Sequence, residues 1–151
     1  MTRAYAPADL GDLGLRHEVG VFVYRSSPGG LLYLLLHPHP RPEEVWRPVV
    51  EPVGLDEDLE QAALRGVRQE TGLNRAWDLV PAGTGLVQHV GDLQLVQWAV
   101  GFQVRSRRIQ LRTRPTVAGS AWRPFEAALR SLATELHRQN LLLLHSRLTA
   151  A

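Results

Sequence analysis

The stretch that decides the fold is residues 51–73, EPVGLDEDLEQAALRGVRQETGL. Its apolar residues recur at helical spacing, and acidic residues precede them, where they favour the positive end of a helix dipole. Asp56 is placed to cap the first turn, and Gly72 is placed to stop the last one. The pattern predicts a helix over residues 56–71, with an apolar stripe made of Leu59, Ala62, Ala63 and Val67.

The same stretch resembles the Nudix box, the sequence motif of the Nudix hydrolase superfamily. The motif reads Gly, five residues, Glu, seven residues, Arg-Glu-apolar-any-Glu-Glu-any-Gly-apolar. Three positions depart from it, since this chain has Glu51 in place of Gly, Gly66 in place of Glu and Gln69 in place of Glu. The box is therefore degenerate, and the positions that match it are Glu57, Arg65, Val67, Glu70, Gly72 and Leu73.

The departures fall on the positions that carry the family's chemistry. Positions 66, 69 and 70 are related as i, i+3 and i+4, so their side chains share one face of a helix. Glutamates there would hold a magnesium ion, which prefers oxygen ligands and neutralises the charge of a diphosphate. This chain offers no side chain at Gly66, a neutral amide at Gln69 and a carboxylate only at Glu70. The resemblance implies the fold and argues against unmodified Nudix catalysis.

The resemblance extends over essentially the whole chain. Residues 46–57 are similar to the strand and glycine loop that lead into the family's helix, and residues 121–129, AWRPFEAAL, are similar to its late tryptophan and helix start. It implies an α/β fold, a Nudix-type α/β/α sandwich around a mixed, partly antiparallel β-sheet. Val50 and Glu51 stand where the family loop has paired glycines, so the phosphate-approaching loop is altered too.

Other elements are read from periodicity and turn residues. The apolar spacing that follows Pro124 predicts one helix over residues 124–148. A hairpin is expected to turn at residues 105–108, where arginines are dense. Strand-like runs are expected at residues 17–25, 31–37, 45–50, 85–90, 93–104 and 107–112.

Length and composition limit the class of protein. The 151 residues suit one domain, expected over residues 1–151 with residues 1–16 as a flexible leader. There is no run of about 18 apolar residues and no signal-peptide pattern, so we expect a cytoplasmic protein with no membrane partner. The chain has no cysteine, and all 17 basic residues are arginine, which excludes thiolate metal sites and lysine nucleophiles. A formal net charge of +2 supports no general affinity for polyanions.

The candidate site residues come from the box and its flanks. Glu70 is the candidate for residual catalysis and the first candidate metal ligand, and Glu57 or Glu51 would assist it in a rearranged site. An active site would use Mg²⁺ or Mn²⁺, and an inactive one would need no cofactor. The substrate-binding candidates are Trp46, Arg47 and Arg68. The structural residues of the box are Glu57, Arg65, Val67, Gly72 and Leu73. In the family, the residues at the positions of Glu57 and Arg65 pair to brace the loop against the helix.

The sequence supports three hypotheses for function. The first is a Nudix-fold protein that is weak or inactive as a pyrophosphohydrolase and keeps a cleft for a nucleotide or a partner; loss of two charged ligands would lower turnover by roughly 10⁴. The second is an active, divalent-metal-dependent hydrolase of nucleoside diphosphate derivatives with a rearranged metal site. The third hypothesis is an RNA- or protein-interaction module that uses the arginine-rich hairpin, with Arg105, Arg107, Arg108, Arg112 and Arg114. Neither the substrate nor the oligomeric state follows from the sequence.

Overall fold

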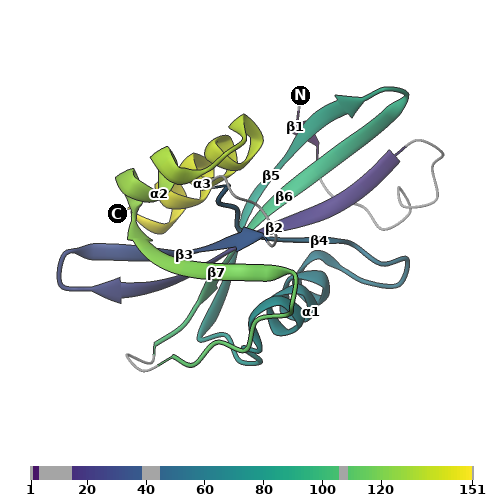
Figure 1. Ribbon diagram of the computed structural model, residues 1–151. Coiled ribbons are helices and arrows are strands. Elements are labelled where there is room, and N and C mark those ends of the chain that lie inside the picture. The colour runs from purple at the N-terminus through teal and green to yellow at the C-terminus, as the bar shows by residue number, and fades with distance from the viewer. Residues whose placement is uncertain (1, 4–14, 39–44, 106–108, 151) are drawn as a thin grey trace.

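In the part of the chain that the structure describes, a seven-stranded sheet is flanked by three helices (Figure 1). The computed structural model describes residues 2–3, 15–38, 45–105 and 109–150. The strands lie in the order β1-β5-β6-β2-β3-β7, and β4 pairs with β2 off this path. The strands are β1 (Thr2–Arg3), β2 (Leu15–Ser27), β3 (Gly30–Pro38), β4 (Val49–Pro52), β5 (Asp78–Val90), β6 (Leu93–Gln103) and β7 (Val117–Pro124); the helices are α1 (Leu59–Thr71), α2 (Phe125–Ser131) and α3 (Glu135–Leu148).

Strand β2 organises the sheet because it pairs with three neighbours. It runs parallel to β6, from Leu15 opposite Gln94 to Tyr24 opposite Gln103. Its early residues pair antiparallel with β4, and its last residues pair antiparallel with β3. The sheet is therefore mixed and largely antiparallel, which confirms the sheet type that the resemblance implied.

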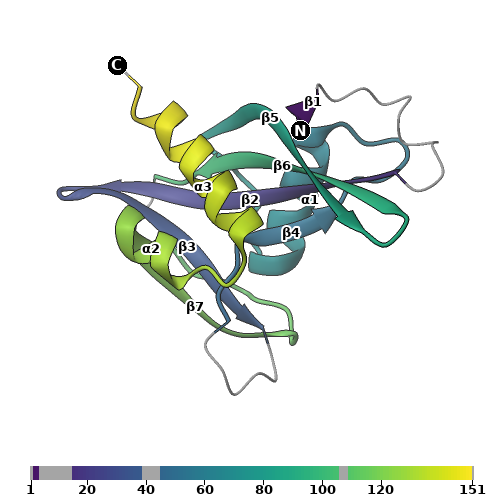
Figure 2. The ribbon, with the colours of Figure 1, turned by 90° about the horizontal axis from the view of Figure 1, so that it is seen from above.

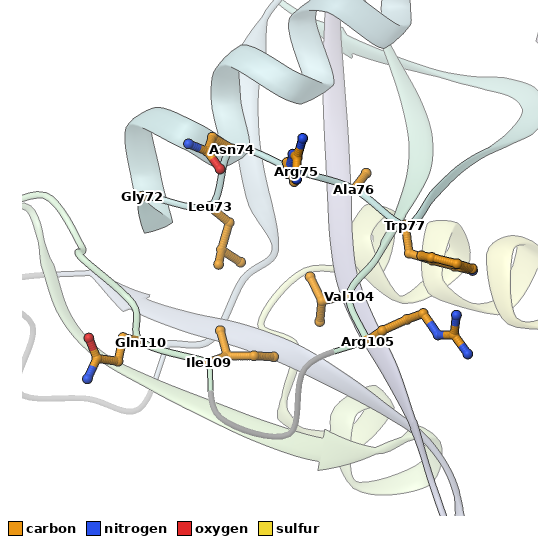
Figure 3. A pocket seen from close by; sticks show the side chains of 10 residues that line it. All are labelled: Gly72, Leu73, Asn74, Arg75, Ala76, Trp77, Val104, Arg105, Ile109 and Gln110. Carbon is orange, nitrogen blue, oxygen red and sulfur yellow. The ribbon is translucent and has the colours of Figure 1, made fainter.

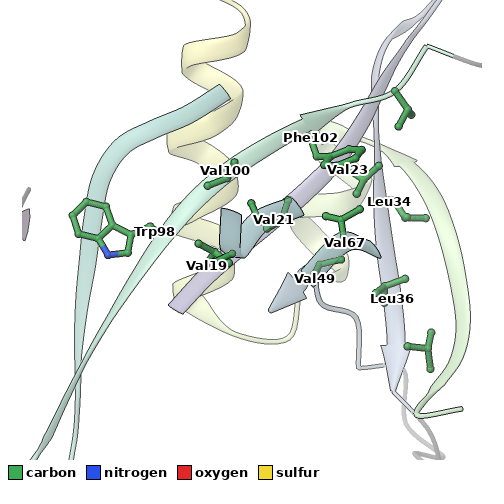
Figure 4. Packing of buried hydrophobic residues seen from close by; sticks show 14 of the residues in the cluster. Val19, Val21, Val23, Leu34, Leu36, Val49, Val67, Trp98, Val100 and Phe102 are labelled. Atoms are coloured by element: carbon green, nitrogen blue, oxygen red, sulfur yellow. The ribbon is translucent and has the colours of Figure 1, made fainter. Parts of the chain in front are cut away.

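The helices cover opposite faces of this sheet, with α1 on one side and the α2–α3 pair on the other (Figures 1 and 2). Alternate residues of β2 face the two layers, as expected for a strand that is buried on both sides. Val19 and Val21 pack in the cluster beneath α1 (Figure 4), whereas Phe22 and Tyr24 pack in the cluster beneath α3. This confirms the predicted α/β/α sandwich.

Helix α1 begins later than the sequence predicted. The cap is Asp58, whose carboxylate accepts a hydrogen bond from the Gln61 amide at 2.8 Å, while the Gln61 side chain accepts one from the Asp58 amide at 2.9 Å. This reciprocal capping box satisfies two free amides at once, which a cap at Asp56 would not, so the predicted Asp56 cap is wrong. Gly72 ends the helix in the left-handed region at φ 79°, which confirms the predicted stop.

The predicted helix over residues 124–148 is wrong, because it is two helices, α2 and α3, separated by residues 132–134. Leu132 pairs with Trp46 in an isolated bridge, and Thr134 caps α3 by accepting from the His137 amide. The Leu132 amide still donates to the Ala128 carbonyl at 3.1 Å, but the Ala133 amide, which would continue the helix, donates to the Trp46 carbonyl at 3.3 Å instead.

The prediction of an arginine-rich hairpin is also wrong for those of its residues that the structure describes. Residues 109–112 belong to no strand, and residues 107–108 of the predicted strand lie outside the described residues. The sequence reading missed β7, which pairs antiparallel with β3. The predicted leader, residues 1–16, is partly built into the sheet through β1 and the start of β2, while residues 4–14 lie outside the described residues. In the described part of the chain, no helix is long and apolar enough to span a membrane.

Candidate ligand site on helix α1

Glu57 and Arg65, the pair with a predicted bracing role, form a two-point ion pair that we call the brace. Nε of Arg65 donates to Oε2 of Glu57 at 2.7 Å, and Nη2 donates to Oε1 at 2.9 Å. Nη2 also donates to the Pro52 carbonyl at 2.6 Å, and the Gly54 amide donates to Glu57 at 2.8 Å. The Arg65 guanidinium lowers the pKa of the Glu57 carboxyl. The brace thus ties the loop that precedes α1 to the middle of the helix.

The face of α1 that the box would use for a metal differs from the motif in structure as well as in sequence. Gly66 is buried and Gln69 is exposed. Glu70 is only 4% exposed, and its Oε2 lies 3.3 Å from Nη2 of Arg47. The charge of the matched carboxylate is therefore neutralised by the protein itself.

Glu51 lies against Gly66 although the two are on different elements. A Cβ atom on residue 66 would lie 2.6 Å from Cγ of Glu51 and 3.1 Å from its Cβ. The Glu51 carboxylate is 3.4 Å from Nη1 of Arg65 through one oxygen and 3.4 Å from Nη2 of Arg114 through the other. Strand β4 therefore delivers a carboxylate to the place that the box gives to a side chain at position 66.

The residues present do not fit a magnesium site. Mg²⁺ requires several hard oxygen ligands in near-octahedral geometry. Across the ranges that the structure describes, no three His, Cys, Asp or Glu residues form a group that could hold a metal ion. The candidate ligands come to one region, but as partners of arginine rather than as a free carboxylate set. We call the four residues outside the brace the α1 ion cluster: Glu51, Glu70, Arg47 and Arg114.

The three candidate substrate residues are placed apart from one another. Trp46 and Arg47 are neighbours in an extended segment, so their side chains point to opposite sides. Arg47 reaches Glu70 in the α1 ion cluster, whereas the Trp46 ring packs with the core beneath α2 and α3, under the guanidinium of Arg123 at 5.1 Å from the ring centroid. Arg68 is exposed on α1.

The described arginines of the predicted hairpin, Arg105, Arg112 and Arg114, lie in different places. Arg105 lies at the end of β6, with its guanidinium 3.9 Å from the centroid of the Trp77 ring. Arg114 belongs to the α1 ion cluster, and Arg112 is exposed beside the end of α1. Arg107 and Arg108 lie outside the described residues.

A hollow of about 510 Å³ lies where α1 ends and β6 ends (Figure 3). Leu73, Val104 and Ile109 give it an apolar wall, and Trp77, which is 63% exposed, stands at its edge with Arg105. Among the described residues that line it, none is a carboxylate or a histidine. It therefore offers no acid or base for hydrolysis.

A second hollow, of about 380 Å³, adjoins Arg47; we call it the polar hollow because most of its lining residues are polar, although their carbon atoms form most of its wall. Nε2 of Gln97 donates to Glu18 at 2.5 Å, and Nδ2 of Asn140 donates to Oε1 of Gln97 at 2.6 Å. Oδ1 of Asn140 and Nδ1 of His137 are buried and make no hydrogen bond within the described structure. Buried polar groups without a partner are costly, which is a reason to expect a ligand or water beside them.

The electrostatics of this polar hollow follow from burial. Burial raises the pKa of Glu18, while its hydrogen bond from Gln97 lowers it in part. Burial, helped by the nearby Arg47, lowers the pKa of His137 to about 4, so the imidazole is neutral near pH 7. The sequence reading missed these residues, although Glu18 and Gln97 interrupt strongly apolar strands and could have signalled a polar pair.

Comparison with known proteins places the fold. No family model and no curated protein matches the sequence. Solved structures do match: the dihydroneopterin triphosphate pyrophosphohydrolase of E. coli has a TM-score of 0.71 and 17% identity, covering 83% of this chain and 91% of that one. An Ap4A hydrolase of C. elegans has a TM-score of 0.67 and 19% identity, covering 88% and 97%.

A third match is the NUDIX domain of Shewanella oneidensis NrtR, whose structure contains ADP ribose. It has a TM-score of 0.70 and 19% identity, and the match covers 96% of this chain and 94% of that domain. Similarity at this level of identity shows a shared fold. The protein therefore has the Nudix fold, as the resemblance implied.

Proposed function

We propose that this Nudix-fold protein binds a nucleotide-like phosphorylated ligand beside α1 and is weak or inactive as a pyrophosphohydrolase. The observation that carries the proposal is the pairing within the α1 ion cluster, where Arg47 neutralises Glu70 and Arg114 neutralises Glu51. Carboxylates held in this way are poor metal ligands. Guanidinium groups, in contrast, match phosphate oxygens in geometry and charge.

The polar hollow beside Arg47 supports a ligand larger than phosphate. Its volume of about 380 Å³ falls in the range of small-molecule sites. Gln97 and His137 line it, and the unpartnered Oδ1 of Asn140 lies behind Gln97. These groups can hydrogen-bond to a heterocycle or a sugar, and the carbon atoms of the wall can pack against its faces.

The solved structures supply the first ligands to test. The NrtR NUDIX domain was solved with ADP ribose, and another match is an Ap4A hydrolase. ADP-ribose and dinucleoside polyphosphates combine a diphosphate with polar nucleoside parts, which is the combination that the α1 ion cluster and the polar hollow would hold.

The proposal is tested by measuring thermal stability and phosphate release in parallel, with ADP-ribose, nucleoside triphosphates and Ap4A, in Mg²⁺, in Mn²⁺ and in EDTA. We expect ligand-dependent stabilisation without turnover; at a ligand concentration near 100 times Kd the gain is about 2.7 kcal/mol. Arg47→Gln should weaken it, and Arg130→Gln, an exposed change on α2, should not. Turnover by the wild-type protein that disappears in Glu70→Gln would contradict the proposal.

A second candidate function is a metal-dependent hydrolase in which Glu51 and Glu70 hold Mg²⁺ or Mn²⁺. The position of Glu51 favours it, since its side chain occupies the space beside Gly66 on the face that also carries Glu70. Both carboxylates would first have to leave their arginines. The same experiment separates the two functions, because this one requires turnover in Mg²⁺ or Mn²⁺ and none in EDTA.

A further inference from the structure

Two of the three departures from the box contact one side chain, Arg114, which lies outside the box between β6 and β7. Nη2 of Arg114 is 3.4 Å from Oε1 of Glu51 and donates to Oε1 of Gln69 at 3.2 Å. Its Nε donates to the backbone carbonyl of Gln69 at 3.3 Å. Two departed positions thus contact the guanidinium directly, and the third, Gly66, leaves the space that the Glu51 side chain needs.

The end of α1 is a favourable place for this positive charge. The last carbonyls of a helix lack partners within the helix and carry its negative dipole end. The segment that contains Arg114 supplies two of the missing partners, since the Arg112 amide donates to the Thr71 carbonyl at 2.8 Å and Arg114 Nε donates to that of Gln69. The protein therefore holds the Arg114 guanidinium in place without any ligand.

The guanidinium of Arg114 still has capacity for an anion. The side chain is 36% exposed, and its contacts with Glu51 and Gln69 are 3.2–3.4 Å long, compared with 2.6–2.9 Å for the contacts of Arg65 with Glu57 and the Pro52 carbonyl. Within the described residues, Nη1 of Arg114 makes no hydrogen bond. The two N–H groups of Nη1 could therefore donate to diphosphate oxygens while the protein keeps its own contacts with Nε and Nη2.

We infer that Arg114 takes the place of the metal ion: it is a built-in cation that binds the diphosphate of the ligand, so that recognition at α1 needs no divalent metal. This inference rests on the proposed function, since it names the group that holds the phosphates. It also explains the departures together, because a glutamate at position 66 would collide with Glu51 and a glutamate at position 69 would compete with the ligand for Arg114.

The test is isothermal titration calorimetry with inorganic pyrophosphate and with ADP-ribose, each in EDTA and in Mg²⁺. We expect both probes to bind in EDTA. Arg114→Gln should lower their affinity about tenfold, the effect of losing one charge-assisted hydrogen-bonding group. Arg114→Lys should retain part of the affinity, because it keeps the charge and loses the fork. Arg112→Gln, an exposed arginine two residues away, is the matched control and should bind like the wild type.

The outcomes separate this inference from the proposed function. ADP-ribose binding that requires Mg²⁺, or that is equal in Arg114→Gln and wild type, would overturn the inference while the proposed function stands. Pyrophosphate binding in EDTA that is lost in Arg114→Gln, without binding of any nucleotide, would support the inference and overturn the proposed nucleotide ligand. Absence of binding by both probes in both conditions would overturn both.

Discussion

The brace and the α1 ion cluster are both carboxylate–guanidinium contacts on the same helix, yet their geometries differ. In the brace, Glu57 and Arg65 meet at two points, 2.7 and 2.9 Å, with a further bond from Arg65 to a backbone carbonyl. In the α1 ion cluster, Glu51 and Glu70 meet Arg114 and Arg47 at 3.4 and 3.3 Å. The first arrangement is saturated, while the second leaves donors unused.

The difference follows the division between matched and departed positions of the box. The brace is made of matched residues and holds the loop on the helix. The α1 ion cluster combines one matched residue, Glu70, with the departed residue Glu51 and two arginines from outside the box. The scaffold part of a site can therefore be retained while its charge arrangement is rebuilt with groups from other elements.

The largest expected effect comes from restoring a glutamate in the region of the cluster. Gly66→Glu should destabilise the protein by about 3–5 kcal/mol, because its Cβ would lie 2.6 Å from Cγ and 3.1 Å from Cβ of Glu51, so that Glu51 must leave its rotamer and its arginines, and because it would bury a further charge. Urea denaturation measures the effect. Arg68→Gln, on the exposed face of the last turn of the same helix, is the matched control and should cost no more than about 1 kcal/mol, the loss of one cation near the helix C-terminus.

The double variant Glu51→Gly, Gly66→Glu recreates the box at both positions and removes the collision. It should be more stable than Gly66→Glu alone by at least about 1 kcal/mol, a coupling typical of residues in contact. Equal stability of the single and double variants would show that the two departures are independent.

The second-largest effect is a pH dependence of stability that involves the α1 ion cluster and not the brace, because His137 lies beside Arg47 of the cluster. Its folded pKa is about 4 against an ordinary value of 6.5, so between these values the unfolded chain binds more protons and stability falls as pH falls. The loss across that window is about 3 kcal/mol. Stability is measured by urea denaturation at several pH values between 4 and 7, and His137→Gln should flatten its dependence on pH in this range. Glu18 and Glu135 line the same hollow and are not changed in this variant. Parallel curves for the two proteins would refute the assignment.

The smallest effect compares the two regions directly. Glu57→Gln should cost about 1–2 kcal/mol near pH 7, because it removes the charge from a two-point pair, and Glu51→Gln should cost less than about 1 kcal/mol. The depressed pKa of Glu57 means that its contribution is present above its unfolded pKa and is lost as pH falls through the folded pKa. The Glu57→Gln difference should therefore shrink in acid. A larger cost for Glu51→Gln than for Glu57→Gln would reverse the comparison.

Several elements could be predicted because their signals are local. Strands β2 and β3 show as apolar runs, and Gly72 ends α1 because only a residue that tolerates positive φ suits that position. The break between α2 and α3 could not be predicted in the same way. Residues 132–134 are compatible with a helix, and what interrupts them is the bridge to Trp46, with the Ala133 amide donating to its carbonyl at 3.3 Å.

The candidate site also has features that the sequence predicts and features that only tertiary contacts determine. The spacing of Gly66, Gln69 and Glu70 on one helix face, and the absence of two expected carboxylates from it, can be read directly from the sequence. The replacement of the missing side chain by Glu51, and the approach of Arg114 across 45 residues to Gln69, cannot be read there.

The sequence by itself determined that the chain carries a helix with the outline of a Nudix box and a carboxylate at only one of the three metal-facing positions, because helical spacing and side-chain chemistry are local properties. Only the tertiary structure decided which groups fill the gap. Pairing of β4 with β2 brings Glu51 against Gly66, and the segment before β7 closes over the end of α1 with Arg114. Such contacts depend on the packing of elements far apart in the chain, and no periodicity within one segment encodes them.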